Sequence, residues 1–113
     1  MLHVQLQRLT SQGYSLLSVD LEGRTALHHA ALRGHKEAVR FLLSSAPPSL
    51  VDIQDTPRCQ TALHVAAEHR RQVICGMLVA AGASLSLTDI KGRTPRDIAI
   101  SNGDVNLAGY LES

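Results

Sequence analysis

The chain has 113 residues, enough for one domain, and 44% of them are hydrophobic but only 3% aromatic, so its core must consist of Leu, Ala, Val and Ile. Eleven Lys and Arg residues stand against ten Asp and Glu, a formal net charge of +1 that argues against a nucleic-acid-binding domain. No apolar run reaches the roughly 18 residues of a membrane span and no secretory signal is visible, so we expect membrane contact to be at most peripheral.

The first predicted element is a helix at residues 2–12, where Leu2, Leu6 and Leu9 recur at helical spacing. Gly13 follows as a stop signal. We interpret this helix as the second half of a helix pair whose first half precedes the chain, which then begins inside a larger protein.

A tight turn at residues 20–24 leads into a predicted helix at residues 25–33. Thr25 stands where an N-cap hydroxyl satisfies a first-turn amide, and Gly34 stands where a left-handed residue ends a helix. A second helix is predicted at residues 36–44. Its buried stripe is Ala38, Val39, Leu42 and Leu43.

The connection at residues 46–60 interrupts this regular pattern. It contains three prolines, Pro47, Pro48 and Pro57, and the first two must end the preceding helix. We expect this connection to be the least regular and the most mobile of the chain.

The next helix pair is predicted at residues 61–69 and 72–80. Arg70 and Cys59 occupy positions where the other units have glycine, and a left-handed Arg70 would cost on the order of 1 kcal/mol. We favour sequence drift over a partner surface as the reason for both. The core candidates of the second helix are Val73, Ile74, Met77, Leu78 and Val79.

The last pair is predicted at residues 94–102 and 104–112, with Gly103 between the helices. Its polar first helix suits a closing unit that faces water. The inward residues of its second helix are predicted to be Val105, Leu107, Ala108 and Leu111.

These units repeat one motif. The segment Thr25-Ala26-Leu27-His28-His29-Ala30-Ala31 recurs as Thr61-Ala62-Leu63-His64-Val65-Ala66-Ala67, and a weaker copy begins at Thr94-Pro95. The spacing and the T-P-L-H-x-A-like signature resemble ankyrin repeats. The resemblance implies an all-α solenoid of helix-turn-helix units joined by hairpin-like fingers. We place a partial repeat at 1–19, repeats at 20–54 and 55–88, and a capping repeat at 89–113.

His28 and His64 have two interpretations. Because they recur with the repeat, we favour a structural role in which each imidazole bonds to the backbone of the adjacent turn. A ligand or a catalytic base is the alternative.

Other candidate sites are weak. Gly23-Arg24-Thr25 and Gly92-Arg93-Thr94 share only a glycine and a threonine with a phosphate-binding loop. Cys59, His64 and His69 lie within eleven residues but need not converge on zinc. We therefore expect no cofactor, no metal and no enzyme activity from this chain. The two cysteines, Cys59 and Cys75, suit a reducing compartment, so we expect a cytoplasmic and/or nuclear location.

A narrower resemblance covers nearly the whole chain. It rests on Leu27-His28-His29-Ala30, Ala46-Pro47-Pro48, Ala81-Gly82-Ala83-Ser84-Leu85, Thr88-Asp89, Thr94-Pro95-Arg96 and Leu107-Ala108-Gly109-Tyr110-Leu111-Glu112. These segments resemble the C-terminal ankyrin region of diacylglycerol kinases of zeta and iota type. The resemblance implies a parent protein that phosphorylates diacylglycerol with ATP in a domain preceding this one.

The expected function is therefore protein binding through the concave groove between fingers and first helices. The expected partner is an acidic, or mixed acidic and apolar, protein segment, and we expect a monomer. The alternatives are a regulatory or membrane-localising element of the lipid kinase, or an interaction module of an unrelated ankyrin protein. The predicted partner-binding residues are Leu21, Glu22, Arg24, Leu32, Arg33, Arg58, Glu68, His69, Ile90, Lys91 and Arg93.

Overall fold

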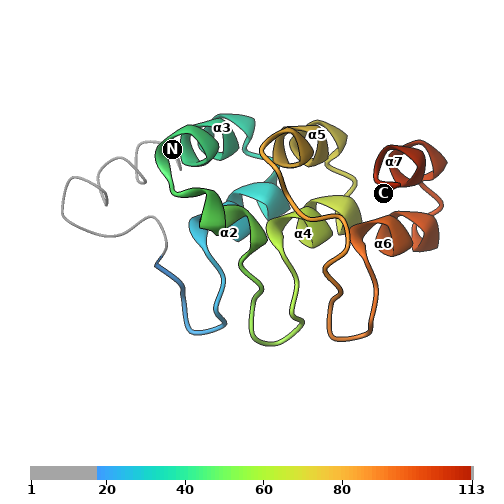
Figure 1. The fold of residues 1–113 in the computed structure, drawn as a ribbon, viewed down its shortest axis with the longest axis horizontal. Coiled ribbons are helices and arrows are strands. Elements are labelled where there is room, and N and C mark those ends of the chain that lie inside the picture. Colours follow the sequence, from blue (N-terminus) through green and yellow to red (C-terminus); the bar gives the residue numbers. More distant parts are fainter. Residues whose placement is uncertain (1–17, 113) are drawn as a thin grey trace.

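The computed structural model describes residues 18–112, and within them three helix pairs stand side by side in two layers (Figure 1). The helix predicted at residues 2–12 lies outside the described residues. One layer holds the first helix of each pair, and the other layer holds the second. The elements are α2 (Ala26–Arg33), α3 (Lys36–Ser45), the 3-10 helix η1 (Pro48–Asp52), α4 (Ala62–Glu68), α5 (Gln72–Ala80), α6 (Pro95–Ser101) and α7 (Val105–Tyr110).

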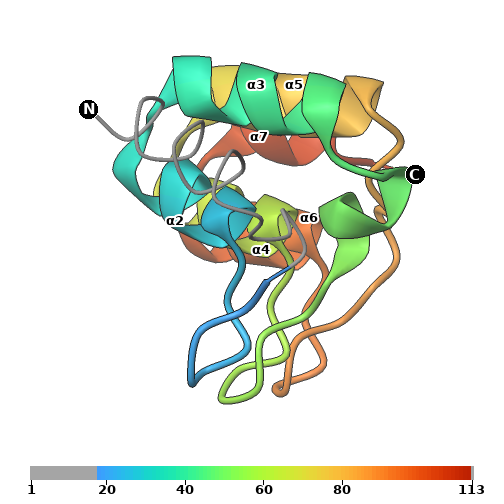
Figure 2. The ribbon, with the colours of Figure 1, turned by 90° about the vertical axis from the view of Figure 1, so that its left-hand side faces the viewer.

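Three fingers project from the first-helix layer, one before each of α2, α4 and α6 (Figure 2). Each finger is closed by a backbone bond at its base, such as that from Asp89 N–H to the Arg93 carbonyl at 2.9 Å. Neighbouring fingers are joined by bonds from Thr56 N–H to the Glu22 carbonyl and from Ile90 N–H to the Arg58 carbonyl, both 2.7 Å. The fingers within residues 18–112 contain no strand, so the predicted hairpins are turns without a ladder.

Each helix lies within one to two residues of its predicted limits because the predicted caps form. Thr25, Thr61 and Thr94 are the N-caps of α2, α4 and α6, and each hydroxyl accepts a bond from the amide three residues on. Helix α3 ends at Ser45, just before the two prolines.

The core is continuous across the three pairs, and α4 is its centre. Every residue of α4 except Glu68 is buried, because α2 packs on one side and α6 on the other. The largest side chains of this core include Leu27, Leu42, Leu63, Ile74, Leu78, Ile98, Leu107 and Leu111. Small residues such as Ala30, Ala66 and Ala67 are fully buried in the first-helix layer and let neighbouring helices approach closely.

Two core predictions are wrong. Val73 is 55% exposed and Val105 is 79% exposed, although both were predicted to face inward. The buried stripe of α5 is Ile74, Cys75 and Leu78, and successive helical side chains differ by about 100°, so Val73 points off this stripe. A helix that is covered on a single side buries a single stripe of residues. The predicted core set was wider than one stripe and comprised Val73, Ile74, Met77, Leu78 and Val79.

The proline-containing connection has more order than the sequence suggested. Pro48 begins η1, and Leu50 and Val51 of this short helix are buried in the core. The side-chain amide of Gln54 then donates to the carbonyls of Cys59 at 2.9 Å and Thr88 at 3.0 Å, which ties this segment to the next finger. Across residues 18–112, no helix has the length and apolar character needed to cross a membrane.

Candidate functional site

The histidine of each repeat motif fixes a finger against a helix. The N–H of Thr25 donates to Nδ1 of His28 at 3.1 Å, and Nε2 of His28 donates to the carbonyl of Gln60, in the next finger, at 2.7 Å. His64 does the same with Thr61 N–H at 3.1 Å and the Arg93 carbonyl at 3.0 Å. The predicted structural role of both histidines is confirmed.

Burial lowers the pKa of His28 and His64 from the ordinary value of 6.5, because the charged imidazolium would be desolvated. Both rings are therefore neutral near pH 7, with the proton on Nε2 and the lone pair on Nδ1. This tautomer supplies the acceptor for the threonine amide and the donor for the next finger.

In the third unit Asp97 replaces the histidine, as the sequence showed. Its Oδ2 accepts from Thr94 N–H at 3.0 Å, and bonds from the Thr94 backbone and side chain lower its pKa. In the described part of the chain no further finger lies beside α6, so an acceptor is sufficient at this position.

Each finger begins with an aspartate that organises its tip, a role that the sequence prediction missed. Asp89 Oδ1 accepts from the amides of Lys91 and Arg93, both at 2.9 Å, and Asp20 Oδ1 accepts from Glu22 and Arg24 in the same way. Hydrogen bonds from Arg24 and His29 lower the pKa of Asp20 to about 2. The recurring Asp-x-x-Gly-Arg-Thr spelling of the first and third tips was the available signal.

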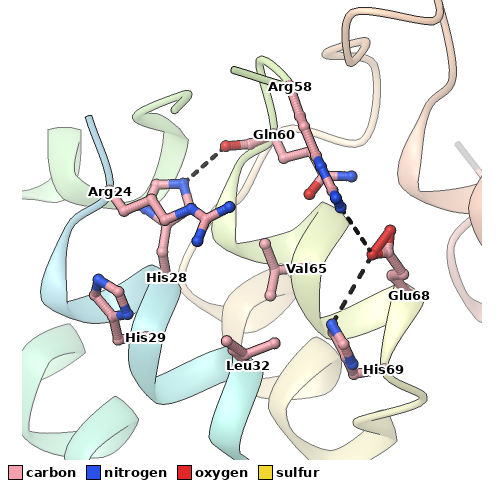
Figure 3. Close-up of a pocket in the computed structure, with 9 residues that line it drawn as sticks. All are labelled: Arg24, His28, His29, Leu32, Arg58, Gln60, Val65, Glu68 and His69. Carbon is pink, nitrogen blue, oxygen red and sulfur yellow. Dashed lines mark hydrogen bonds and ion pairs between the residues drawn. The ribbon is translucent and has the colours of Figure 1, made fainter. Parts of the chain in front are cut away.

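Two hollows form a groove where the fingers meet the first helices. One, of about 60 Å³, lies between the first and second fingers, and the other, of about 300 Å³, lies between the second and third. They share Arg58, Gln60 and Glu68. Figure 3 shows the smaller hollow, with Leu32 and Val65 in its middle. Arg24, His28 and His29 lie on one side of these two residues, and Arg58, Glu68 and His69 lie on the other.

The structure brings most of the predicted partner-binding residues to this groove. Leu21, Glu22 and Arg33 line neither hollow, although all three are exposed nearby on the first finger and on α2. His29 and Val65 line the smaller hollow and were not predicted. The predicted residues that do line the groove are Arg24, Leu32, Arg58, Glu68, His69, Ile90, Lys91 and Arg93.

Carboxylates compensate much of the positive charge that the sequence indicated for this row. Arg24 lies 3.3 Å from Asp55 and Arg93 lies 3.0 Å from Asp89, and both aspartates are buried. Arg58 lies 3.6 Å from Glu68. Arg24 and Arg93 are therefore structural ion-pair partners, whereas Lys91 forms no ion pair among the described residues.

Gln60 lies where the two hollows meet. Its side chain is buried, at 3% exposure, and its Nε2 has no hydrogen-bond partner in the described residues. The histidines and Cys59 do not form a metal site there, because no three His, Cys, Asp or Glu side chains within residues 18–112 gather as metal ligands would.

Comparisons with known proteins agree with this geometry. The family model for ankyrin repeats (3 copies) matches residues 3–89. Diacylglycerol kinase iota of Homo sapiens is 46% identical over 101 residues, covering 89% of this chain and 10% of the relative. Diacylglycerol kinase zeta of Rattus norvegicus is 45% identical over 109 residues, covering 96% and 12%. The eye-specific diacylglycerol kinase of Drosophila melanogaster is 46% identical over 108 residues, covering 96% and 7%. The chain thus spans a small part of each kinase.

Proposed function

The chain belongs to the ankyrin repeat family, and from that premise we propose that it is a non-catalytic module that binds a protein partner in the groove between fingers and first helices. The observation that carries this proposal is the pair of hollows that meet at Arg58, Gln60 and Glu68. A segment of a partner lying across both would contact three fingers and two first helices at once.

The groove is held in one shape before a partner arrives. His28 and His64 fix the second and third fingers to the preceding helices, and backbone bonds join adjacent fingers. Preorganisation of this kind lowers the entropy cost of binding. We therefore expect little change in the backbone when the groove is occupied.

The chemistry of the groove favours a partner segment with both acidic and apolar side chains. A partner carboxylate can approach Lys91, and it can replace Glu68 beside Arg58, whose ion pair with Glu68 is partly exposed and weak. Leu21 is fully exposed on the first finger beside the groove, and Ile90 is 64% exposed on the third finger, where it lines the groove. Both offer apolar contacts.

A peptide library displayed on phage provides the test. We expect the chain to select peptides that combine Asp or Glu with Leu, Ile or Val. The double substitution Arg58→Glu and Lys91→Glu should weaken their binding at least tenfold, about 1.4 kcal/mol. Arg24 and Arg93 are unsuitable for this test, because their pairs with Asp55 and Asp89 support the fold.

The matched control is Lys36→Glu with Arg40→Glu, which changes the net charge equally but on α3, outside the groove. It should leave peptide affinity within a factor of about two. Equal loss in both double variants, or none in the groove variant, would contradict binding through the groove.

We also propose that the parent protein is a diacylglycerol kinase of zeta or iota type and that this segment regulates it from the C-terminal side. Similarity to such kinases over most of the chain supports this context. The isolated chain should not phosphorylate diacylglycerol. If the segment instead docks on the kinase's own catalytic domain, adding the isolated chain to a kinase that lacks the segment should change its rate, and the groove variant should not.

A further inference from the structure

A separate hollow of about 290 Å³ lies between the turn that joins α2 to α3 and the turn that joins α4 to α5. Figure 2 shows the α2–α3 turn beside the two helix layers, away from the finger tips below them. We call this hollow the turn pocket. It is lined by Gly34 and Lys36, by Arg70 and Arg71, and by the first turn of α5. No groove residue is among its lining residues, so it is independent of the proposed function.

Backbone carbonyls hold the guanidinium groups of Arg71 and Arg70 on opposite sides of the α4–α5 turn, and of the two that of Arg71 lies toward Gly34 and the turn pocket. Arg71 Nη2 donates to the Leu32 carbonyl at 3.1 Å, and Arg70 Nη2 donates to the Asn102 carbonyl at 2.6 Å. A Cβ at Gly34 would lie 3.0 Å from the guanidinium carbon of Arg71, so the absence of a side chain at Gly34 lets this guanidinium lie against the turn.

The charges of the turn pocket have no carboxylate partner. Lys36, Arg70 and Arg71 take part in none of the ion pairs of the described residues, whereas Arg24, Arg58 and Arg93 of the groove are all paired. A carbonyl leaves the full positive charge of a guanidinium uncompensated. Each arginine also keeps N–H donors that its carbonyl bond does not use.

The helix ends at the turn pocket add to this preference for an anion. The N-cap positions of α3 and α5 are His35 and Arg71, and neither provides a side-chain acceptor for the first-turn amides. In the third pair Asp104 stands at the corresponding position, and its Oδ1 accepts from Leu107 N–H at 3.2 Å. The last unit therefore has a carboxylate at its N-cap position, whereas the central unit has no anionic side chain at the corresponding position.

We propose that the turn pocket binds the phosphate group of a phosphorylated serine or threonine in a partner protein. Two cations, Lys36 and Arg71, and two uncapped helix N-termini around one hollow suit a phosphate, which carries nearly two negative charges near pH 7, better than a carboxylate. Guanidinium groups bind phosphate oxygens through paired N–H donors. Val73, on the rim, offers an apolar contact to a residue next to the phosphorylated one.

This arrangement suits a single phosphate group that enters the hollow better than it suits the surface of an anionic membrane. Although Arg71 is exposed, its guanidinium lies back against the Leu32 carbonyl of α2 and beside Gly34, so it is held between the two turns and does not extend away from the surface. Attachment to a bilayer instead uses side chains that extend from the surface toward the headgroups.

The test is a titration of the isotope-labelled chain with N-acetyl-phosphoserine amide, followed by amide NMR shifts. We expect saturable shifts at Gly34, Lys36, Gln72 and Val73, and none with the unphosphorylated serine compound. Arg71→Gln should weaken binding roughly tenfold. Lys36→Gln should also weaken it without loss of stability, because Lys36 lines the pocket, is exposed and forms no ion pair among the described residues.

Arg40→Gln is the matched control, since it removes the same charge from an arginine that is paired with Glu37 outside the pocket. It should retain the affinity of the original chain, as should the groove variant with Arg58→Glu and Lys91→Glu. If Arg71→Gln fails to fold, the Lys36→Gln result decides.

Three results would overturn the proposal. They are the absence of saturable shifts, equal weakening by Arg40→Gln and Lys36→Gln, and equal shifts with the unphosphorylated compound. Sedimentation with phosphatidylcholine and phosphatidylserine vesicles, without any response to phosphoserine, would assign the pocket to a membrane surface instead.

Discussion

At His28 and His64, one imidazole satisfies polar groups from two repeats. Its Nδ1 completes the cap of its own helix, and its Nε2 binds the carbonyl of the next finger. Each ring is buried and neutral, and each bond depends on one tautomer. Protonation of Nδ1 would place a donor against the donating amide of Thr25 or Thr61. The charge state of His28 and His64 is therefore coupled to the stability of the repeat stack.

We predict that the chain loses stability on acidification below about pH 6.5. Because burial lowers the folded-state pKa of both histidines, the unfolded state binds more protons as the pH falls through 6.5 and below, and the free energy of unfolding decreases. Asp20, Asp89 and Asp97 have lowered pKa values and contribute to acid unfolding only below their ordinary value of 3.8. Urea unfolding between about pH 7.5 and about pH 4.5 isolates the histidines.

The double substitution His28→Gln and His64→Gln should lower stability near neutral pH and flatten its decrease over that interval. If the double variant keeps the same decrease with pH as the original chain, the two histidines are not its source.

At the scale of the element, each finger and each helix turn depends on one residue with positive φ. In the fingers these residues are Gly23, Cys59 and Gly92, with φ of 75°, 54° and 76°. In the turns they are Gly34, Arg70 and Gly103, with φ of 72°, 58° and 72°. The backbone geometry is therefore the same in all three units, and the central unit bears the strain of a side chain at both positions.

We predict opposite effects for two substitutions at corresponding finger positions. Cys59→Gly should raise the free energy of unfolding by about 1 kcal/mol, because it relieves the left-handed strain of a side chain. Gly23→Ala should lower it by more than about 1 kcal/mol, since the new Cβ would be strained and would lie 2.8 Å from Thr56 Oγ1. Urea unfolding followed by circular dichroism measures both, and a loss of stability in Cys59→Gly would contradict the strain at this tip.

At the scale of the whole molecule, the three pairs share one core and none closes it alone. Helix α4 packs against α2 and α6, and α3 packs against α5, so the central pair contacts both of its neighbours. In a short stack of this kind, stability depends on the interfaces between units. We therefore expect the described helices to unfold together.

Leu63→Ala should lower the free energy of unfolding by about 2–5 kcal/mol in one cooperative transition, because Leu63 is fully buried in α4. Val105→Ala is the control, and its effect should be below about 0.5 kcal/mol since this side chain is mostly exposed. Separate transitions for the central and terminal pairs, seen by amide hydrogen exchange, would contradict a shared core.

The sequence by itself determined the local features and their repetition. Threonine caps, left-handed positions and proline stops act over a few residues, so the limits of the helices could be predicted closely. The repeating Leu and Ala positions predicted the stacked pairs, and the recurrence of His28 and His64 predicted their structural role. The groove could be placed from repeat register, which brought most of the nominated residues, such as Arg58 and Ile90, to one surface.

Only the tertiary structure decided what each charge faces. Arg24 meets an aspartate 31 positions away, and Arg71 meets a carbonyl 39 positions away, so the groove is less basic than its row of arginines suggested and the turn pocket remains cationic. Val73 and Val105 likewise became surface residues because each outer helix is covered on one side. Such pairings depend on how neighbouring units pack, whereas caps and periodicity depend on residues adjacent in the chain.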